Sequence, residues 1–445
     1  MGNKVNVAEL IGSQRFGAFQ LRIVILCGMI QFLDGFDTQA MGYAGPALRA
    51  AWHIAPQALG SVFAFGAFGT GVGSILLGPL ADVFGRRKLM IATVAIFGVL
   101  TFFTAFAHST DELRIWRLLA GFGLGAALPL TFVVANEFAP SRIRARMIAA
   151  MACGFAVGAL SGGLLEAALI PLFGWQAIFY FGGIVPVILA AALFLFLPES
   201  VRFLVTRPGT SQEIAAILNK MDARLSFATE TEFVVPAEPE TRGFAPIRLF
   251  SEGRAAMTMS LWVVYLVTLG LLNTLNNWLP VAINMAGLPV QRSVLMTTLF
   301  QFGGIAGVLS LGALADRIGY FRVLVSAYAL LAVCIAAIGS VGNAQLALAA
   351  AIAGTGVFLI GANNTLNAFA STLYPTVIRS TGVSWGSSFG RLAGSVGPYF
   401  AGVLLAVLPL GTTFMIFAIP ALIGSVGIFG MMRAISMPRT KMEFS

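Results

Sequence analysis

Residues 78–90 read GPLADVFGRRKLM, and residues 312–324 repeat the pattern as GALADRIGYFRVL. A second match follows each copy at nearly the same separation, since PSRIRA at 140–145 corresponds to PTVIRS at 375–380. Two patterns that recur in the same order indicate an internal duplication of the chain. Long apolar runs surround both copies, so the sequence predicts two similar membrane-embedded halves with a site between them near the bilayer midplane.

Apolar residues dominate the chain outside these motifs. Of 445 residues, 58% are hydrophobic and 10% charged, and the mean hydropathy is +0.89. A soluble protein needs charges on about a quarter of its residues, so this composition indicates a polytopic membrane protein. A helix crosses a bilayer with about twenty residues, and we expect spans at 20–43, 57–80, 88–108, 112–137, 146–170, 175–197, 256–285, 292–315, 321–341, 344–371, 379–408 and 411–433.

The only long polar interruption lies in the middle of the chain and contains charges and prolines, with a short surface helix expected around 211–225. It divides the spans into two groups of six. The expected organisation is a cytoplasmic N-terminus at 1–19, an N-terminal six-helix bundle at 20–197, a cytoplasmic central loop at 198–255, a C-terminal six-helix bundle at 256–433 and a cytoplasmic tail at 434–445.

The charge distribution predicts the orientation. The net charge is +9, and the basic residues gather in short segments between alternate apolar runs, such as GRRK at 85–88. This is the positive-inside pattern and not a groove for nucleic acid. Both termini are therefore expected in the cytoplasm and the chain in the inner membrane, surrounded by lipid. As a separate expectation, the chain functions as a monomer. The first 19 residues contain no apolar core of signal-peptide type, so we expect no cleavage there.

The doubled G-x-L-A-D-x-x-G resembles the signature loop of the major facilitator superfamily. That resemblance implies an all-α membrane protein of twelve transmembrane helices in two pseudo-symmetric six-helix bundles, with these loops latching the cytoplasmic side in one state. The alternative is that they serve only as turns and topology signals. The residues assigned to this cytoplasmic gate are Gly78, Asp82, Gly85, Arg86, Arg87, Arg144, Asp316, Arg317, Gly319 and Arg379.

Three further segments narrow the resemblance. FLDGFDTQAMGYAGPAL at 32–48 is similar to the first helix of aromatic acid:proton symporters of that superfamily. NNWLP at 276–280 and the segment 373–398 resemble the same family's helix 7 and helix 10–11 region. The resemblance implies proton-driven uptake of a benzoate-type anion, of the hydroxybenzoate or protocatechuate kind, for aromatic catabolism. Gentisate, benzoate, vanillate, a phenylpropionate or a lactone relative stay open as substrates.

Acidic residues inside the expected spans are candidates for proton coupling. A carboxylate at the bilayer centre costs about 2.5–3.5 kcal/mol on insertion scales, yet Asp34 and Asp37 lie three residues apart in the first span. Each could bind a proton from one side and release it to the other, whereas His53 and His108 fall at the outer margin. A fixed ion pair with a buried arginine is the alternative. Glu137, at the end of span 4, fits a charge relay and a helix-end salt bridge equally well.

Two arginines complete this set. Arg117 lies early in span 4 and Arg391 centrally in span 11. A guanidinium stays charged and can bind a carboxylate through two parallel hydrogen bonds. We assign Arg391 to the substrate carboxylate and Arg117 to a helix 1 aspartate, although the two roles could be exchanged. Near Arg391, a row of glycines is better explained by helix packing: Gly382, Gly386, Gly390 and Gly394.

Amides and one indole are candidates for the aromatic ring of the substrate. An indole face stacks on a benzene ring and amides bond its hydroxyl groups. The set is Asn276, Asn277, Trp278, Gln301, Asn363 and Asn364. Each amide could equally bridge helices, and Trp278 could be an interfacial anchor. Pro280 is expected to break the helix soon after this segment. Glu166, near the outer end of span 5, is a further buried acid with no family motif around it.

No enzyme site is apparent. The chain lacks a G-x-x-x-x-G-K-[S/T] loop, so ATP does not drive the expected transport, and it lacks Cys/His metal spacing. We expect no metal and no cofactor. Two rival functions remain: a proton-driven exporter of the same fold, and a membrane sensor that binds aromatic acids without moving them.

Overall fold

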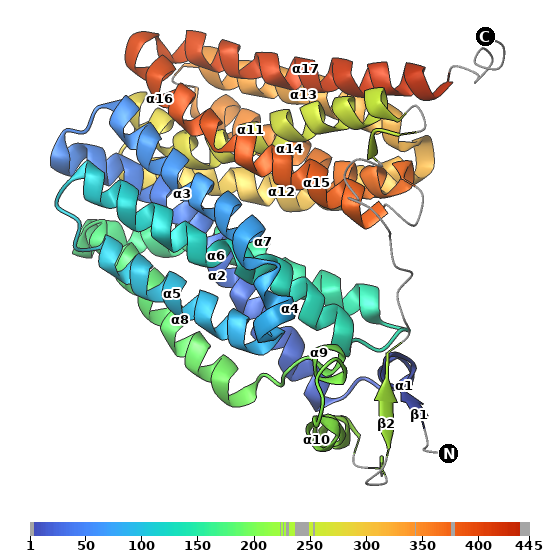
Figure 1. The fold of residues 1–445 in the computed structure, drawn as a ribbon. Coiled ribbons are helices and arrows are strands. Elements are labelled where there is room, and N and C mark those ends of the chain that lie inside the picture. The colour runs from blue at the N-terminus through green and yellow to red at the C-terminus, as the bar shows by residue number, and fades with distance from the viewer. Residues whose placement is uncertain are drawn as a thin grey trace. The chain divides into compact units, whose positions relative to one another are not determined.

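The computed structural model describes residues 4–222, 224–225, 227, 231–235, 249–251, 254–342, 344–374 and 379–436, without the side chains of 145, 379–381, 393 and 433–436. Twelve helices in this part of the chain are long and apolar enough to cross a membrane (Figure 1). The predicted number of spans is confirmed, and the chain is a multi-pass membrane protein whose described spans are helices. Pro375 and the basic residues Arg439 and Lys441 lie outside the described residues.

The helices of the first half follow the predicted spans closely. They are α2 (Ala18–Trp52), α3 (Pro56–Leu77), α5 (Arg86–Thr104), α6 (Thr110–Phe138), α7 (Arg144–Phe173) and α8 (Gln176–Phe196). α2 extends nine residues beyond its predicted end at 43. Bilayer thickness set that prediction, whereas the following AGPALRAAW is rich in helix formers. The helix ends before His53, whose φ is +52°.

The second half consists of α11 (Ala255–Met285), α12 (Val290–Ile318), α13 (Tyr320–Ser340), α14 (Gln345–Leu373), α15 (Arg379–Gly394), α16 (Val396–Val407) and α17 (Leu410–Ser436). The predicted eleventh span is thus two helices, α15 and α16, that meet at Ser395. The backbone N–H of Ser395 bonds to the carbonyls of Arg391 and Leu392, at 3.2 and 3.3 Å. The short elements of the chain are β1 (Lys4–Asn6), α1 (Val7–Ser13), α4 (Leu80–Phe84), α9 (Val201–Val205), α10 (Ser211–Met221) and β2 (Glu232–Val234).

Contacts group the chain into two compact units. Unit 1 comprises Met1–Ala40, Phe68–Gly162 and Phe173–Glu240; unit 2 comprises Met41–Ala67, Gly163–Leu172 and Thr241–Ser445. The helices α2, α3 and α7 therefore each contribute to both units. The predicted division into bundles at 20–197 and 256–433 stays a prediction.

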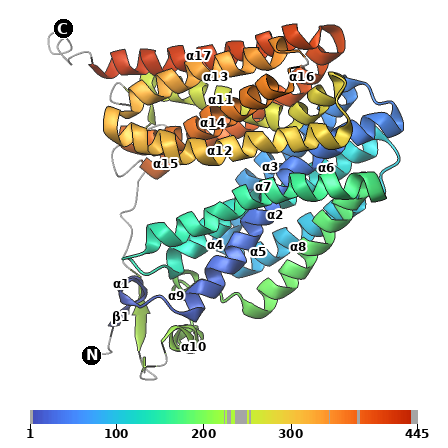
Figure 2. The same ribbon diagram turned by 180° about the vertical axis from the view of Figure 1, so that it is seen from behind.

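Unit 1 is built around close helix contacts. α5 packs along α6 and α8 (Figures 1 and 2). α2 approaches α7 at Gly35, where an added Cβ would lie 2.0 Å from the carbonyl oxygen of Phe155. Only glycine permits backbones to approach this closely. The core between these helices is apolar and includes Phe97, Phe138 and Leu193, none more than 1% exposed.

Short elements gather at one end of unit 1, where α1, α9, α10, β1 and β2 lie together (Figures 1 and 2). β1 pairs in parallel with β2, with Lys4 opposite Glu232. The backbone N–H of Ser141 donates to the carbonyl of Gly12 at 2.9 Å. α10 confirms the helix predicted around 211–225, and it buries Ile214 and Leu218 on one face.

Unit 2 also consists of paired helices. α12 packs along α14, α13 along α17, and α11 along α15, α16 and α17. Large apolar side chains remain exposed on these helices, such as Leu309 at 71% and Val426 at 70%. Exposed apolar surface of this extent is costly in water but not in lipid. The pattern accords with helices that face a bilayer.

Candidate functional site

A buried ion pair joins two predicted site residues within unit 1. Arg117 on α6 donates through both terminal nitrogens to the two carboxylate oxygens of Asp37 on α2, at 2.7 and 2.8 Å. The side chains are 7% and 5% exposed. The guanidinium also lies over the ring of Phe179, 6.0 Å from its centroid. The sequence predicted that Arg117 partners a helix 1 aspartate, and the structure identifies Asp37.

Asp34 lies one helical turn before Asp37 and is equally buried, at 3% exposed. Another turn earlier, the side-chain N–H of Gln31 donates to the hydroxyl of Thr131 on α6 at 2.7 Å. Thr131 in turn donates to the carbonyl of Leu128. One face of α2 therefore presents a row of polar side chains in unit 1, and two of its members contact α6.

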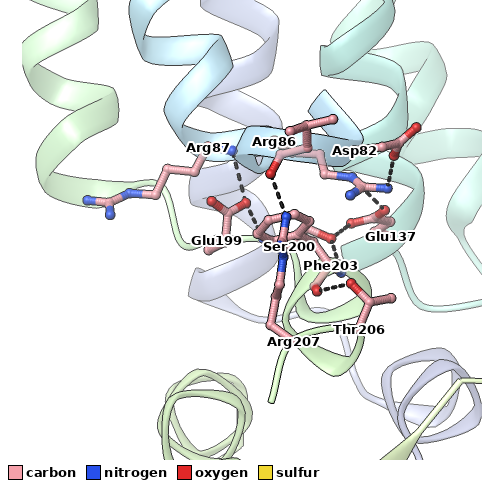
Figure 3. A network of polar contacts seen from close by, with 10 residues as sticks. Asp82, Arg86, Arg87, Glu137, Glu199, Ser200, Phe203, Thr206 and Arg207 are labelled. Atoms are coloured by element: carbon pink, nitrogen blue, oxygen red, sulfur yellow. Dashed lines mark hydrogen bonds and ion pairs between the residues drawn. The ribbon is translucent and has the colours of Figure 1, made fainter. Parts of the chain in front are cut away.

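The first copy of the repeated motif takes part in a polar network (Figure 3). Arg86 lies 2.7 Å from Asp82 and 3.8 Å from Glu137. Glu137 accepts a hydrogen bond from the hydroxyl of Ser200, the N-cap residue of α9. Glu137 thus connects the end of α6 to both the motif loop and the central loop. This geometry contains the predicted helix-end salt bridge, and a role in a charge relay stays a prediction.

Glu199 holds the turn of the same motif. Its carboxylate accepts hydrogen bonds from the backbone N–H groups of Arg87 and Ser200, at 3.0 and 2.9 Å. Gly85 forms this turn with φ +96° and ψ 151°, a conformation essentially restricted to glycine. An added Cβ at Gly85 would lie 2.4 Å from the Glu199 carboxylate. Gly78 begins the motif directly after α3.

The second copy of the motif is more open. Gly319 ends α12 with φ +92° and ψ 146°, the same turn as at Gly85. Asp316 and Arg317 are exposed, and neither forms an ion pair with any described residue of the chain. Arg144 begins α7 with a half-buried side chain. Arg379 begins α15, and its side chain lies outside the described residues. The latch role of this set stays a prediction.

The amide candidates of unit 2 contact neighbouring protein groups. Gln301 on α12 donates to the side-chain oxygen of Asn276 on α11 at 3.2 Å. Asn277 donates to the carbonyl of Asn273 one turn earlier, at 2.8 Å. On α14, Asn364 is exposed and donates to the carbonyl of Ile360 at 3.1 Å, whereas Asn363 is half-buried. The structure therefore brings Asn276 and Gln301 together as a helix bridge.

Trp278 is 1% exposed and packs between helices. Its indole N–H donates to the carbonyl of Pro398 on α16 at 2.8 Å, and its ring meets Phe63 on α3 edge to face. This burial excludes the interfacial-anchor alternative in the state observed. A stacking contact with a substrate ring stays a prediction for Trp278, and it requires the Phe63 or Pro398 contact to change.

The prediction that Pro280 breaks its helix is wrong. α11 continues through Pro280 to Met285. Proline cannot donate to the carbonyl of residue i−4, here Asn276. At that carbonyl α2 comes very close, because an added Cβ at Gly42 would lie 2.5 Å from the Asn276 oxygen. Neighbouring helices make prolines tolerable inside membrane helices, and α2 packs closely against α11 at this carbonyl.

Arg391 is half-buried in the last turn of α15. The glycine row beside it packs against aromatic residues and α11. An added Cβ at Gly386 would lie 2.9 Å from the ring of Tyr265, and one at Gly390 would lie 2.8 Å from the Tyr265 carbonyl. Helix packing therefore explains the glycines, as the sequence indicated. Helix packing does not explain why an arginine lies within this row, between Gly390 and Gly394.

One family model matches the sequence over most of its length. The model described as Major Facilitator Superfamily matches residues 27–398 and, in a second match, 293–442. The chain belongs to the Major Facilitator Superfamily. Its members are transporters, so the protein is a transporter and not an enzyme. The fold and family inferred from the doubled motif are confirmed.

Within this superfamily, several named transporters are similar to the chain. The gallate transporter of Pseudomonas putida is 38% identical over 426 residues, which cover 95% of this chain and 94% of the relative. The 4-hydroxybenzoate transporter PcaK of the same species is 33% identical over 434 residues, covering 96% of each. The benzoate transport protein of Acinetobacter baylyi is 31% identical over 436 residues, covering 96% of this chain and 93% of the relative.

Solved superfamily structures share the fold. A D-xylose-proton symporter has a TM-score of 0.74 at 16% identity, covering 93% of this chain and 98% of that one. The partially occluded inward-open form of the xylose transporter XylE from Escherichia coli has a TM-score of 0.73 at 16% identity, covering 96% and 100%. At such identity the likeness shows the superfamily fold alone.

Sequence reasoning missed several residues that hold these sites. Glu199 and Ser200 belong to the sequence PES at 198–200, which lies at the start of the predicted central loop. A proline followed by an acid and an N-cap serine is a helix-start signal that could have indicated α9. Tyr265, whose hydroxyl donates to Asn367 at 2.8 Å, gave no such signal.

Proposed function

We propose that this transporter takes up an aromatic carboxylate with protons by alternating access. The substrate class is supported by relatives named for gallate, 4-hydroxybenzoate and benzoate that align over nearly the whole chain. We expect the transporter to lie in the inner membrane with both termini in the cytoplasm, because the basic residues gather on one side of the spans.

The observation that carries the coupling proposal is the buried Asp37–Arg117 pair beside Asp34. An arginine and two carboxylates are costly to bury inside membrane-spanning helices, and ionisable residues at such positions mark substrate, ion or proton pathways. In the proposed cycle, a proton from outside neutralises Asp34 or Asp37. If the proton binds Asp37, the charge that holds Arg117 is removed and α2 and α6 can change their contact. Opening to the cytoplasm then allows the proton to leave.

Arg391 is the proposed receptor for the substrate carboxylate. A guanidinium can bind a benzoate-type anion through two hydrogen bonds, and Arg117 is already engaged by Asp37. The half-buried amide Asn363 and the Asn276–Gln301 pair are the proposed partners of ring hydroxyl groups. Asn277, Asn364 and Trp278 complete the proposed set, each after a change in its present contact.

Proteoliposomes test the proposal directly. We expect uptake of 4-hydroxybenzoate or gallate that rises with an imposed inward proton gradient. Asp34→Asn and Asp37→Asn should lose accumulation against a gradient, and at least one should keep counterflow exchange, which needs no net proton movement. Glu213→Gln on the exposed face of α10 is the matched control and should behave as the unsubstituted chain.

Three outcomes would contradict the proposal. Accumulation by both aspartate variants would show that neither carboxylate couples protons to substrate. Efflux driven by the same gradient would indicate the exporter instead. Ligand-induced stabilisation without any solute flux would indicate the sensor.

A further inference from the structure

Helix α14 of unit 2 has a polar face along its second half. The residues between positions 363 and 372 that are exposed or half-buried are all small or polar, namely Asn363, Asn364, Asn367, Ala368, Ser371 and Thr372. Residues four apart lie one above the other on a helix, so these six form one continuous surface. The opposite side is buried and includes Leu366 and Phe369.

This polar face differs from the other open surfaces of unit 2. α12 and α17 expose large apolar side chains, such as Leu309 and Val426, whereas α14 exposes none between positions 363 and 372. An amide in hydrocarbon without a hydrogen-bond partner is costly. Polar residues of membrane-spanning helices therefore face the protein interior or a water-filled space, and the composition of this face fits contact with water or substrate.

One amide on the polar face is held in a fixed orientation. The hydroxyl of Tyr265 on α11 donates to the side-chain oxygen of Asn367 at 2.8 Å. Tyr265 is 0% exposed, whereas Asn367 is half-buried. No described residue accepts a hydrogen bond from the amide nitrogen of Asn367. Because the amide group is planar and its oxygen is engaged by the buried phenol, Asn367 presents its two N–H donors.

The neighbouring amides of this face are not oriented in the same way. Asn364 donates to the carbonyl of Ile360 in its own helix, at 3.1 Å. Asn363 forms no side-chain hydrogen bond with any residue in the described part of the chain. Asn367 is thus the amide of the polar face whose donors are both available and oriented by a buried partner.

Tyr265 also contacts the helix that contains Arg391. α11 packs along both α14 and α15. An added Cβ at Gly386 would lie 2.9 Å from the Tyr265 ring, and one at Gly390 would lie 2.8 Å from the Tyr265 carbonyl. Arg391 directly follows Gly390. Tyr265 therefore connects Asn367 to the segment of α15 that contains the proposed carboxylate receptor.

We propose that Asn367 selects substrates that have a hydroxyl group on the ring, and that Tyr265 is its positioning residue. The N–H groups of Asn367 donate to the oxygen of this hydroxyl while Arg391 binds the carboxylate. Benzoate offers no such acceptor and leaves the donors unpaired, so it binds less tightly. This inference rests on the proposed function and adds the feature that distinguishes hydroxybenzoates from benzoate.

Competition for uptake measures this preference. Proteoliposomes take up labelled gallate or 4-hydroxybenzoate in the presence of unlabelled benzoate, 4-hydroxybenzoate or gallate. The ratio between the half-inhibitory concentrations of benzoate and of each hydroxylated acid does not depend on the amount of folded protein. We expect the unsubstituted chain to favour a hydroxylated acid by about fivefold, the size of one hydrogen bond between uncharged groups. Asn367→Leu has a similar volume but no donor, and it should abolish the preference.

Tyr265→Phe tests the positioning role. It removes the hydroxyl that orients the amide and should reduce the preference, although by less than Asn367→Leu does. In the double variant the substitution at Tyr265 should add no further change, because Tyr265 acts through Asn367. Tyr328→Phe is the matched control, since Tyr328 is also 0% exposed in unit 2 and its hydroxyl contacts Thr268 instead. It should keep the full preference.

The outcomes separate this inference from the proposed function. The same preference in Asn367→Leu and in the unsubstituted chain would overturn the role of Asn367 while leaving the proposed function intact. If Asn367→Leu does not fold, equal preferences in Tyr265→Phe and Tyr328→Phe would overturn the inference in its place. An unsubstituted chain that transports benzoate and hydroxylated acids without preference would also contradict it. Failure of that chain to take up any aromatic acid would count against the proposed function.

Discussion

Arg117 holds Asp37 through two hydrogen bonds of 2.7 and 2.8 Å, and both side chains are at most 7% exposed. The pair joins α6 to α2 inside unit 1. Because each charge depends on the other for compensation, the pair makes the contact between these helices sensitive to any loss of charge at Asp37.

Asp37→Asn alone should destabilise the protein more than a double substitution that removes the charges of both Asp37 and Arg117. Removal of one partner from a buried ion pair costs about 3–5 kcal/mol, because the other charge is left uncompensated. The double variant Asp37→Asn with Arg117→Gln contains no isolated charge and should unfold at a higher temperature than Asp37→Asn. Thermal unfolding in detergent measures both. A single variant as stable as the unsubstituted chain would argue against a structural dependence on this pair.

Arg391→Lys should weaken transport through substrate binding. Lysine keeps the positive charge but cannot bind a carboxylate through two parallel hydrogen bonds. We expect the KM for 4-hydroxybenzoate to rise by about tenfold, equivalent to about 1.4 kcal/mol. Initial uptake rates measure the change. Arg292→Lys, at an exposed position of α12, is the control, and an unchanged KM in Arg391→Lys would remove Arg391 from the binding site.

Gly85→Ala and Gly319→Ala form a matched pair. Both glycines adopt a backbone conformation that other residues avoid at a cost of about 1–3 kcal/mol. At Gly85 the new methyl group also collides with Glu199, whereas an added Cβ at Gly319 has nothing within 4 Å. Gly85→Ala should therefore lower the unfolding temperature more than Gly319→Ala. Equal losses would mean that Glu199 moves aside without cost.

Gly42→Ala should impair folding, because its methyl group would lie 2.5 Å from the backbone oxygen of Asn276. Backbone cannot yield as a flexible side chain can. Gly270→Ala is the control within the same unit, since its Cβ would lie 4.0 Å from the nearest atom. That control should gain about 0.5–1 kcal/mol of helix stability. Yield of folded protein after detergent extraction measures both, and normal yield of Gly42→Ala would contradict the close contact.

The sequence was sufficient to predict the fold because its signals are local or repeated. The twelve apolar runs predict the twelve spans. The two copies of G-x-L-A-D-x-x-G indicate the superfamily. The Asp37–Arg117 contact was predicted only as one of two pairings, because helix 1 contains two acids and spacing alone does not decide between them. The structure settles that partner through the position of α6.

Other features depend on neighbours that no local pattern reveals. Pro280 looked like a helix breaker, yet a closely packed α2 permits the helix to continue. Glu199 lies within the predicted central loop, yet its carboxylate accepts hydrogen bonds at the turn of the first motif. Glu166 could be recognised as a buried acid from its position in a span, but a cavity beside it arises from three helices that are distant in sequence.

The parallel pairing of β1 with β2 has a consequence for biosynthesis. Lys4–Asn6 are synthesised before Glu232–Val234, and six spanning helices lie between these two strands in the sequence. The two strands can therefore pair only after all six of these helices have been synthesised. Closure of a loop carries an entropic cost that rises only slowly with its length, so the long intervening chain adds little to the cost of pairing β1 with β2.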